Sequence, residues 1–278
     1  MLRKCNLIFQ KLNLLNFIKG GSMSFTSIGS VADEHTAGII IIGDEILSGQ
    51  QRDTNSHFIC THLYNCGVKV KKISVVCDDV EIIADEIRNY SSKYKYVITA
   101  GGVGPTHDDV TYEGLAKAFD DNLHYHPLIL DIVKKLFNIQ DETSPGLKLA
   151  YIPEKSSLKF GKQIQFPCIN VENVYVFPGS PRYLEPSFQA LCKDLFSGPT
   201  KFIKKKLYIN VPEELFANAL TTVSKEFPHV KFGSYPVADQ SDYQVIVTIE
   251  SDNEHDTDIA IKRFRDLAPS NIFKNIEI

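Results

Sequence analysis

A glycine-rich, acidic loop is the part of the sequence whose residue types are best suited to chemistry. The segment TAGGVGPTHDDVT, residues 99–111, follows an apolar stretch and brings three glycines together with Asp108 and Asp109. Glycines allow backbone N–H groups to approach a phosphate closely, and a helix beginning near Thr111 would add its positive N-terminal end. Two carboxylates would repel that phosphate unless a cation lay between them. The loop therefore predicts a nucleotide phosphate site with a divalent cation, Mg²⁺ or a transition-metal ion.

The same loop has a simpler interpretation without catalysis. Glycine-rich turns between a strand and a helix are common in α/β proteins, and an aspartate near a helix start often only caps the helix. The letters GGVG match neither the Walker pattern nor G-x-G-x-x-G, so neither of those mechanisms can be transferred. We interpret His107 as a loop surface residue, with a base or a metal ligand as alternatives, and His57 as an ordinary hydrogen-bonding residue.

Two more polar turns follow predicted strands and are expected at the same edge of a sheet. One is GDEILSG, residues 43–49, in which Asp44 and Glu45 could complete the oxygen shell of the cation. The other is PGSP, residues 178–181. Ligands of open parallel sheets bind outside the carboxyl ends of the strands, so a parallel sheet would bring all three loops to one rim.

The stretches around these loops alternate between strand and helix patterns. Continuous β-branched runs predict buried strands, and apolar residues at helical spacing with capping residues predict helices. This alternation predicts a parallel α/β sheet in a domain of residues 34–198. The predicted strands are 37–43, 68–77, 96–100 and 174–177, and the predicted helices are 53–67, 78–94, 111–119, 127–137 and 182–196.

Two regions depart from this alternation. Residues 141–153 are predicted to form a loop-rich connection, and residues 157–172 a β-hairpin with Gly161 in its turn. After a turn-rich boundary at 197–200, the order becomes strand, helix, strand, strand, helix, strand. That order is typical of the split βαβ, ferredoxin-like arrangement and predicts a small α+β domain over residues 199–278.

Composition and charge narrow the classes of partner. The chain has 278 residues, of which 43% are hydrophobic and 23% charged, as in ordinary globular proteins. Its formal net charge of −4 argues against general nucleic-acid binding and against a polybasic membrane anchor, and no apolar run approaches the length of a membrane span. The six cysteines contain no C-x-x-C pair, so we expect reduced thiols in the cytoplasm or the mitochondrial matrix.

The first 33 residues differ from the rest of the chain. They carry four basic residues and no acid before Asp33, with Leu, Ile and Phe between the basic residues and serines toward the end. This composition is typical of a mitochondrial transit peptide. The alternative is a disordered leader, with Met23 as a second translation start.

The loops carry a resemblance to a known family. GGVGPTHDDVT is similar to the signature of the MoaB/Mog-like molybdopterin-binding domain. IIGDEILSGQQRDTNSHF, KLAYIP and FPGSPRYLEP resemble the longer version of that domain, found in CinA-type proteins and in the amino-terminal half of animal-type FAD synthases. The resemblance covers roughly residues 36–196 and implies a three-layer α/β fold with a mostly parallel sheet. His107 and the segment KFGSYPVADQSDYQVIVTIES favour the FAD synthase branch.

The resemblance implies an activity. That activity is metal-dependent hydrolysis of a dinucleotide pyrophosphate. In the FAD synthase branch FAD gives FMN and AMP, and in CinA-type domains the substrate is ADP-ribose. FAD synthases of this type continue into a PAPS-reductase-like domain that adenylylates FMN. We expect this chain to lack that domain, so that FAD synthesis would need a separate synthase chain. Domains of this fold tend to form homo-oligomers, and we expect the same here.

The matching motifs also imply site residues. Asp44 and Asp109 are the expected ligands of the divalent metal, which would be Mg, Mn or Co, and Asp108 is expected to assist them in catalysis. The proposed reaction is attack of metal-activated water on one phosphorus. The residues expected to contact the nucleotide and its phosphates are Gly43, Asn55, Ser56, Gly101, Gly102, Gly104, Thr111, Gly179 and Ser180.

Two other functions fit the sequence. One is binding and adenylylation of molybdopterin, or insertion of its metal. It suits the central loop equally well, but it suits the longer first motif and the carboxyl-terminal module less well. The other is a non-catalytic domain that binds FAD or a flavin enzyme partner and regulates it. The intact acids at Asp44, Asp108 and Asp109 argue against lost turnover.

Overall fold

The computed structural model describes residues 35–199, 201–238 and 242–274, and the predicted leader of residues 1–33 lies outside them. The largest sheet contains the strands β1 Thr36–Ile42, β2 Lys69–Val76, β3 Tyr96–Ala100, β6 Ser157–Lys159, β7 Cys168–Val171 and β8 Val174–Phe177. Their order in the sheet is β2-β1-β3-β8-β7-β6. The first four are parallel and the last two pair antiparallel, so the mostly parallel sheet is confirmed.

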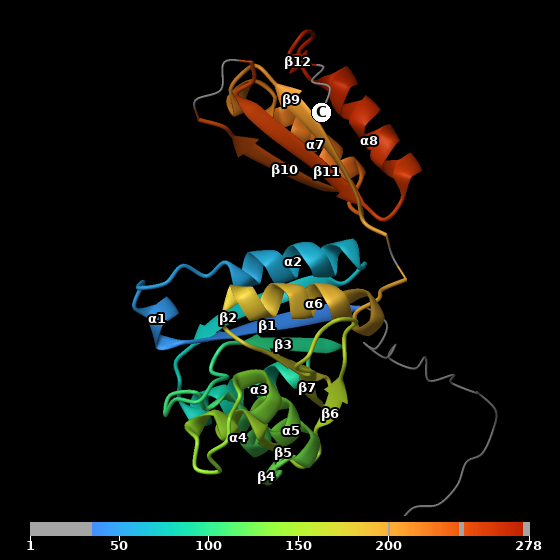
Figure 1. Ribbon diagram of the computed structural model, residues 1–278. Coiled ribbons are helices and arrows are strands. Elements are labelled where there is room, and N and C mark those ends of the chain that lie inside the picture. Colours follow the sequence, from blue (N-terminus) through green and yellow to red (C-terminus); the bar gives the residue numbers. More distant parts are fainter. Residues whose placement is uncertain (1–34, 200, 239–241, 275–278) are drawn as a thin grey trace, which may run out of the picture. The chain divides into compact units, whose positions relative to one another are not determined.

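Helices cover both faces of this sheet (Figure 1). α2 (Asn55–Asn65) and α6 (Pro181–Leu195) pack on one face. α3 (Val80–Ser91), α4 (Thr111–Ala118) and α5 (Pro127–Phe137) pack on the other. The three-layer α/β architecture implied by the family resemblance is therefore confirmed.

Strand β1 shows why the sheet is buried on both faces. All of its residues are buried. Because alternate side chains of a strand point to opposite faces, Ile40 and Ile42 join the core beneath α3, α4 and α5, whereas Ile39 and Ile41 join the core beneath α2 and α6. Consecutive isoleucines thus serve two cores, which explains the continuous apolar pattern of this strand.

The structure corrects two details of the predicted elements. The turn expected after β1 holds a short helix, α1 (Asp44–Leu47). The connection expected to be loop-rich contains the 3-10 helix η1 (Pro145–Ala150) and β5 (Tyr151–Pro153), which pairs antiparallel with β4 (Leu123–Tyr125). These segments are too short for the spacing of their apolar residues to show whether they form a helix, a strand or a loop. The predicted hairpin is confirmed, since β6 pairs antiparallel with β7 and Gly161 lies in their connection.

The carboxyl-terminal part has a sheet of its own. Its elements are β9 Ile203–Ile209, η2 Glu213–Leu215, α7 Ala217–Glu226, β10 Lys231–Pro236, β11 Val245–Ser251, α8 Glu254–Leu267 and β12 Phe273–Lys274. The strands form an antiparallel sheet in the order β10-β11-β9-β12, and Phe216, Val247 and Phe264 are buried in its core. This is the strand order of the ferredoxin-like split βαβ, so the predicted α+β arrangement is confirmed.

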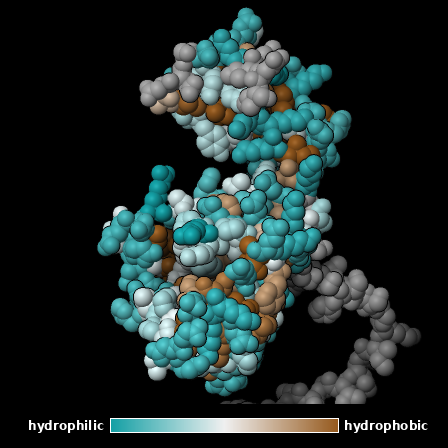
Figure 2. All heavy atoms as spheres, in the orientation of Figure 1, coloured by the Kyte–Doolittle hydropathy of each residue, from teal (hydrophilic) through white to brown (hydrophobic). Residues whose placement is uncertain are grey.

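The surface in view is mostly hydrophilic, with apolar residues gathered in small patches (Figure 2). The exposed large apolar residues include Tyr125, Leu128 and Phe137, which belong to β4 and α5. None of the helices in the described part of the chain is long and apolar enough to cross a membrane.

Candidate functional site

The carboxyl ends of four parallel strands meet at one edge of the larger sheet. Gly43, directly after β1, donates its N–H to the Val76 carbonyl at the end of β2 (3.1 Å). Gly101, directly after β3, donates its N–H to the Phe177 carbonyl at the end of β8 (3.2 Å). The loops after β1 and β3 are therefore bonded to the ends of adjacent strands, and the turn 178–181 begins directly after one of these ends, at Phe177. We call this edge the rim and define it as residues 43–49, 77–79, 101–111 and 178–181.

The rim loops approach one another so closely that one position requires glycine. A Cβ on Gly101 would lie 1.9 Å from the Ile42 carbonyl oxygen, and φ at Gly101 is +116°. A Cβ on Gly179 would lie 3.1 Å from the Gly101 Cα. The loop after β3 thus lies against the end of β1 on one side and against the turn after β8 on the other.

Thr111, the first residue of α4, holds the glycine loop in place. Its side chain is fully buried. Its hydroxyl donates to the Gly101 carbonyl (2.8 Å), and its N–H donates to the Gly102 carbonyl (3.1 Å). A hydroxyl has only one hydrogen to donate. In this arrangement the hydroxyl and the N–H of Thr111 position the loop, and its predicted contact with phosphate stays a prediction.

Asp108 and Asp109 are both bonded to Thr106. The Asp109 Oδ2 accepts the Thr106 N–H (2.8 Å) and lies 2.6 Å from the Thr106 hydroxyl, which also contacts Asp108 Oδ1. A Cβ on Gly104 would collide with the Asp109 carboxylate, so this glycine leaves the space that the carboxylate occupies. The hydrogen bond from Thr106 lowers the pKa of Asp108, which favours the ionised form of this carboxylate.

Asp78 is a rim residue that the motifs did not single out. It follows β2, and its Oδ2 accepts the Asp44 N–H at the start of α1 (2.9 Å). Partial burial raises the pKa of Asp78. The bond from Asp44 opposes that shift, and the charges of Asp44, Glu45 and Asp108 add to it. Negatively charged carboxylates from the loops after β1 and β3 therefore lie close enough to Asp78, after β2, to make its ionisation less favourable. The signal available in the sequence is the acidic pair Asp78-Asp79 directly after a predicted strand.

In the described part of the chain, the acidic side chains of the rim do not form a complete metal-binding site by themselves. Within residues 35–199, 201–238 and 242–274, no group of three or more His, Cys, Asp or Glu side chains is arranged to hold a metal ion. The predicted ligands Asp44 and Asp109 lie on different loops, and His57 and His107 are exposed. Mg²⁺ is commonly held by one or two carboxylates together with substrate phosphates and water. The donors present therefore fit a cation that is bound jointly with a phosphate ligand.

Asn55, at the start of α2, is bonded to the turn after β8. Its Nδ2 donates to the Gly179 carbonyl (2.7 Å), and its Oδ1 is buried without a hydrogen-bond partner among the described residues. The neighbouring Ser56 donates its N–H to Asp53 Oδ1 (3.0 Å), and Ser180 precedes the first turn of α6. The predicted nucleotide contacts from these two motifs thus lie together at the N-terminal ends of α2 and α6, where backbone N–H groups favour anions.

Two families match successive parts of this chain. Residues 38–197 match the family described as probable molybdopterin binding domain, and residues 201–277 match the FAD synthase middle domain. A probable FAD synthase of Caenorhabditis briggsae is 39% identical over 243 residues, which are 78% of this chain and 46% of that protein. The chain thus spans about half the length of the worm relatives that it matches.

Shorter relatives match over nearly their whole length. A protein of Archaeoglobus fulgidus is 34% identical over 229 residues, which are 82% of this chain and 96% of that protein. The crystal structure of a CinA protein with unknown function from Thermoplasma acidophilum is 32% identical, covers 58% of this chain and 98% of its own, and superposes with a TM-score of 0.54. The chain therefore belongs to the molybdopterin-binding domain family, in the CinA-like and FAD synthase-like form that continues into an FAD synthase middle domain.

Proposed function

We propose that this protein hydrolyses a dinucleotide pyrophosphate with the help of a divalent cation, with FAD as substrate and FMN and AMP as products. Water adds across the P–O–P linkage, so each product keeps one phosphate. ADP-ribose is the second substrate to consider for the same reaction. The observation that supports the proposal is the meeting of acids from three loops at the rim. Asp78 Oδ2, after β2, accepts the Asp44 N–H after β1 (2.9 Å), and the charges of Asp44 and of Asp108, which belongs to the glycine loop itself, both act on Asp78. Carboxylates and phosphates repel each other, so such a site needs a cation to hold both.

Each part of the rim has a task in this reaction. The Gly101 N–H is already bonded to the Phe177 carbonyl, so the N–H groups of Gly102 and Gly104 hold the phosphates, together with the N-terminal ends of α4 and α6. Asp44 and Asp109 contact the cation, and Asp78 and Asp108 add negative charge around it. Asn55 Oδ1 accepts a hydrogen bond from a donor on the nucleotide. When bound, the cation supplies positive charge that offsets the charge developing on the reacting phosphate.

Binding of molybdopterin is the second candidate function. The family that matches residues 38–197 is described as a probable molybdopterin binding domain. Molybdopterin also carries a phosphate, so the glycine loop suits either ligand. The match of residues 201–277 to the FAD synthase middle domain favours a flavin nucleotide instead.

The test is an incubation of the purified full chain with FAD, and separately with ADP-ribose, in Mg²⁺, Mn²⁺, Co²⁺ or EDTA. Products are separated by chromatography. We expect FMN and AMP only when a cation is present, with a rate that falls at least about 100-fold in Asp109→Asn. Asp121→Asn is the matched control, because Asp121 Oδ2 also accepts a backbone N–H, from Lys155 (2.8 Å), but follows the opposite end of α4.

Two outcomes would contradict the proposal. Binding of FAD without products in any of the cations would support a regulatory, non-catalytic domain. Binding of molybdopterin without binding of FAD would support the second candidate. Circular dichroism of each variant separates loss of chemistry from loss of fold.

A further inference from the structure

Beside the glycine loop lies a pocket of about 620 Å³ to which the proposed hydrolysis assigns no task. Pro105 of the loop after β3, Tyr125 of β4, Tyr151 of β5 and Leu130 of α5 contribute to its walls, together with η1. A volume of this size is typical of pockets that take a small ligand. The chemistry of its lining indicates which kind of ligand would fit it.

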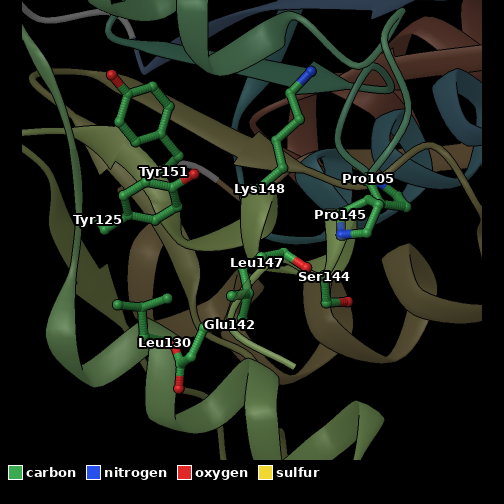
Figure 3. Close-up of a pocket in the computed structure, with 10 residues that line it drawn as sticks. Pro105, Tyr125, Leu130, Glu142, Ser144, Pro145, Leu147, Lys148 and Tyr151 are labelled. Carbon is green, nitrogen blue, oxygen red and sulfur yellow. The ribbon is translucent and has the colours of Figure 1, made fainter. Parts of the chain in front are cut away.

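Two tyrosines form an aromatic wall. Tyr125 and Tyr151 are direct cross-strand partners in the β4–β5 pair, with ring centroids 4.8 Å apart and an angle of 42° between the rings. Tyr125 is 54% exposed, so much of its ring is available for contact. In Figure 3 both rings lie on one side of the pocket and Pro105 and Pro145 on the other, with Lys148 between them. Rigid apolar groups on two sides suit a flat ring better than a flexible chain.

Lys148 connects this pocket to the rim. Its Nζ donates to the Thr106 carbonyl (2.9 Å) and lies 3.5 Å from a Glu113 carboxylate oxygen. The other polar atoms of Thr106 are bonded to Asp109. One residue, Thr106, therefore separates the Lys148 ammonium from a carboxylate of the proposed reaction site. A nucleotide with its phosphates on the glycine loop can direct its attached ring toward the tyrosines.

We propose that this pocket binds a planar heteroaromatic ring of the dinucleotide, stacked on Tyr125 and Tyr151. The proposal rests on the proposed function, since that function places a dinucleotide at the rim. Bases stack on aromatic side chains through their π-faces, and this contact does not require a particular set of hydrogen bonds. The Lys148 ammonium can donate to ring oxygen or nitrogen acceptors. The isoalloxazine and the adenine of FAD share this chemistry, and the experiment distinguishes them.

The test uses FMN, riboflavin and AMP as separate probes with the full chain in the presence of Mg²⁺, which offsets the charge that the phosphate probes meet at the rim. Flavin fluorescence reports stacking, because a tyrosine in contact with the isoalloxazine quenches its emission. Calorimetry reports AMP binding. We expect Tyr151→Ala and Tyr125→Ala to weaken binding of the stacked probe at least roughly fivefold and to raise KM for FAD more than they lower kcat. Tyr151→Phe retains the ring and should restore binding.

Tyr235→Ala is the matched control, because Tyr235 of β10 is 55% exposed and Tyr125 is 54% exposed. Weaker binding of FMN and riboflavin in the Tyr151→Ala variant assigns the subsite to the isoalloxazine, and weaker binding of AMP assigns it to the adenine. Unchanged affinity for all three probes in both alanine variants overturns the subsite even if FAD is hydrolysed. Ring binding that depends on Tyr151 in a protein without hydrolase activity overturns the proposed function and leaves the subsite standing.

Discussion

The Nδ2 atom of Asn55 lies 2.7 Å from the carbonyl oxygen of Gly179, which is 124 residues further along the chain. This bond joins the first residue of α2 to the turn that leads into α6, and these two helices cover the same face of the sheet (Figure 1). The Oδ1 atom of the same side chain is buried and has no hydrogen-bond partner in the described part of the chain. Because a buried unpaired acceptor is unfavourable, we interpret Oδ1 as an atom that pairs with the bound nucleotide.

Asn55→Ala tests this interpretation. We expect it to lower the free energy of unfolding by about 1 kcal/mol, because the bond to Gly179 is lost, and to raise KM for FAD. Urea denaturation and steady-state kinetics measure the two effects. Asn65→Ala, at the exposed opposite end of α2, is the control. An unchanged KM in the Asn55 variant would show that its Oδ1 does not contact substrate.

Substitutions at the rim glycines should separate folding from catalysis. Gly101→Ala places a Cβ against the Ile42 backbone, which cannot move aside, so we expect a loss of at least about 3 kcal/mol or no folded protein. Gly49→Ala also has a positive φ, +73°, but has open space around it and should cost only about 1 kcal/mol.

Gly104→Ala completes this series. Its Cβ would meet the Asp109 carboxylate, a side chain that can rotate. We therefore expect a folded protein with a strongly reduced rate of FMN release. Thermal unfolding and product chromatography distinguish the three variants. Equal stability of the Gly101 and Gly49 variants would show that the close approach of the loop after β3 to the end of β1 is not required.

The sequence predicts best the elements whose pattern is long and repeated. α5 spans 127–137 as expected, because Pro127 marks its start and apolar residues recur at helical spacing. The buried run of β1 and the three polar turns also predict the parallel sheet and the rim. These features are carried by residues that lie close together in the sequence, so one amino-acid sequence is sufficient to predict them.

Features made by contacts between distant segments could not be predicted in the same way. Asp78 and Asp79 are adjacent acids after β2, yet Asp79 caps α3 through the Glu81 and Ile82 N–H groups whereas Asp78 bonds Asp44. Nothing in their residue types separates these roles. The ring pocket likewise depends on the pairing of Tyr125 with Tyr151, which lie in strands of three residues each. Only the folded chain brings them together.

The charge on Asp78 should reduce stability at neutral pH. Burial and neighbouring acids raise the pKa of this carboxyl, so the native state holds its proton more tightly than the unfolded chain does. The resulting stabilisation is present at low pH and is lost as the pH rises through the raised pKa. Asp78→Asn keeps an acceptor for the Asp44 N–H and removes the charge. We expect its Tm at pH 7 to exceed that of the wild type, and the difference to shrink as the pH falls toward the ordinary pKa of an aspartate.

The adjacent acid provides the control for this prediction. Asp79→Ala removes the side-chain cap of α3 and should lower the free energy of unfolding by about 1 kcal/mol. Thermal unfolding between pH 4 and pH 8 measures both variants. A Tm difference for Asp78→Asn that does not change with pH would mean that ionisation of Asp78 is not its cause.

Cation binding should depend on a phosphate ligand. The described residues offer no group of three metal-ligating side chains, so a cation alone should bind weakly. AMP alone should also bind weakly, because its phosphate faces the carboxylates of Asp44, Asp78 and Asp109. We expect Mn²⁺ and AMP together to raise Tm by more than the sum of their separate effects, since each reduces the unfavourable charge that the other meets. In the Asp44→Asn variant, the Tm shift with Mn²⁺ and AMP together should exceed the sum of the separate shifts by a smaller amount. A full shift with Mn²⁺ alone would indicate a preformed metal site, and a full shift with AMP alone would show that phosphate binding needs no cation.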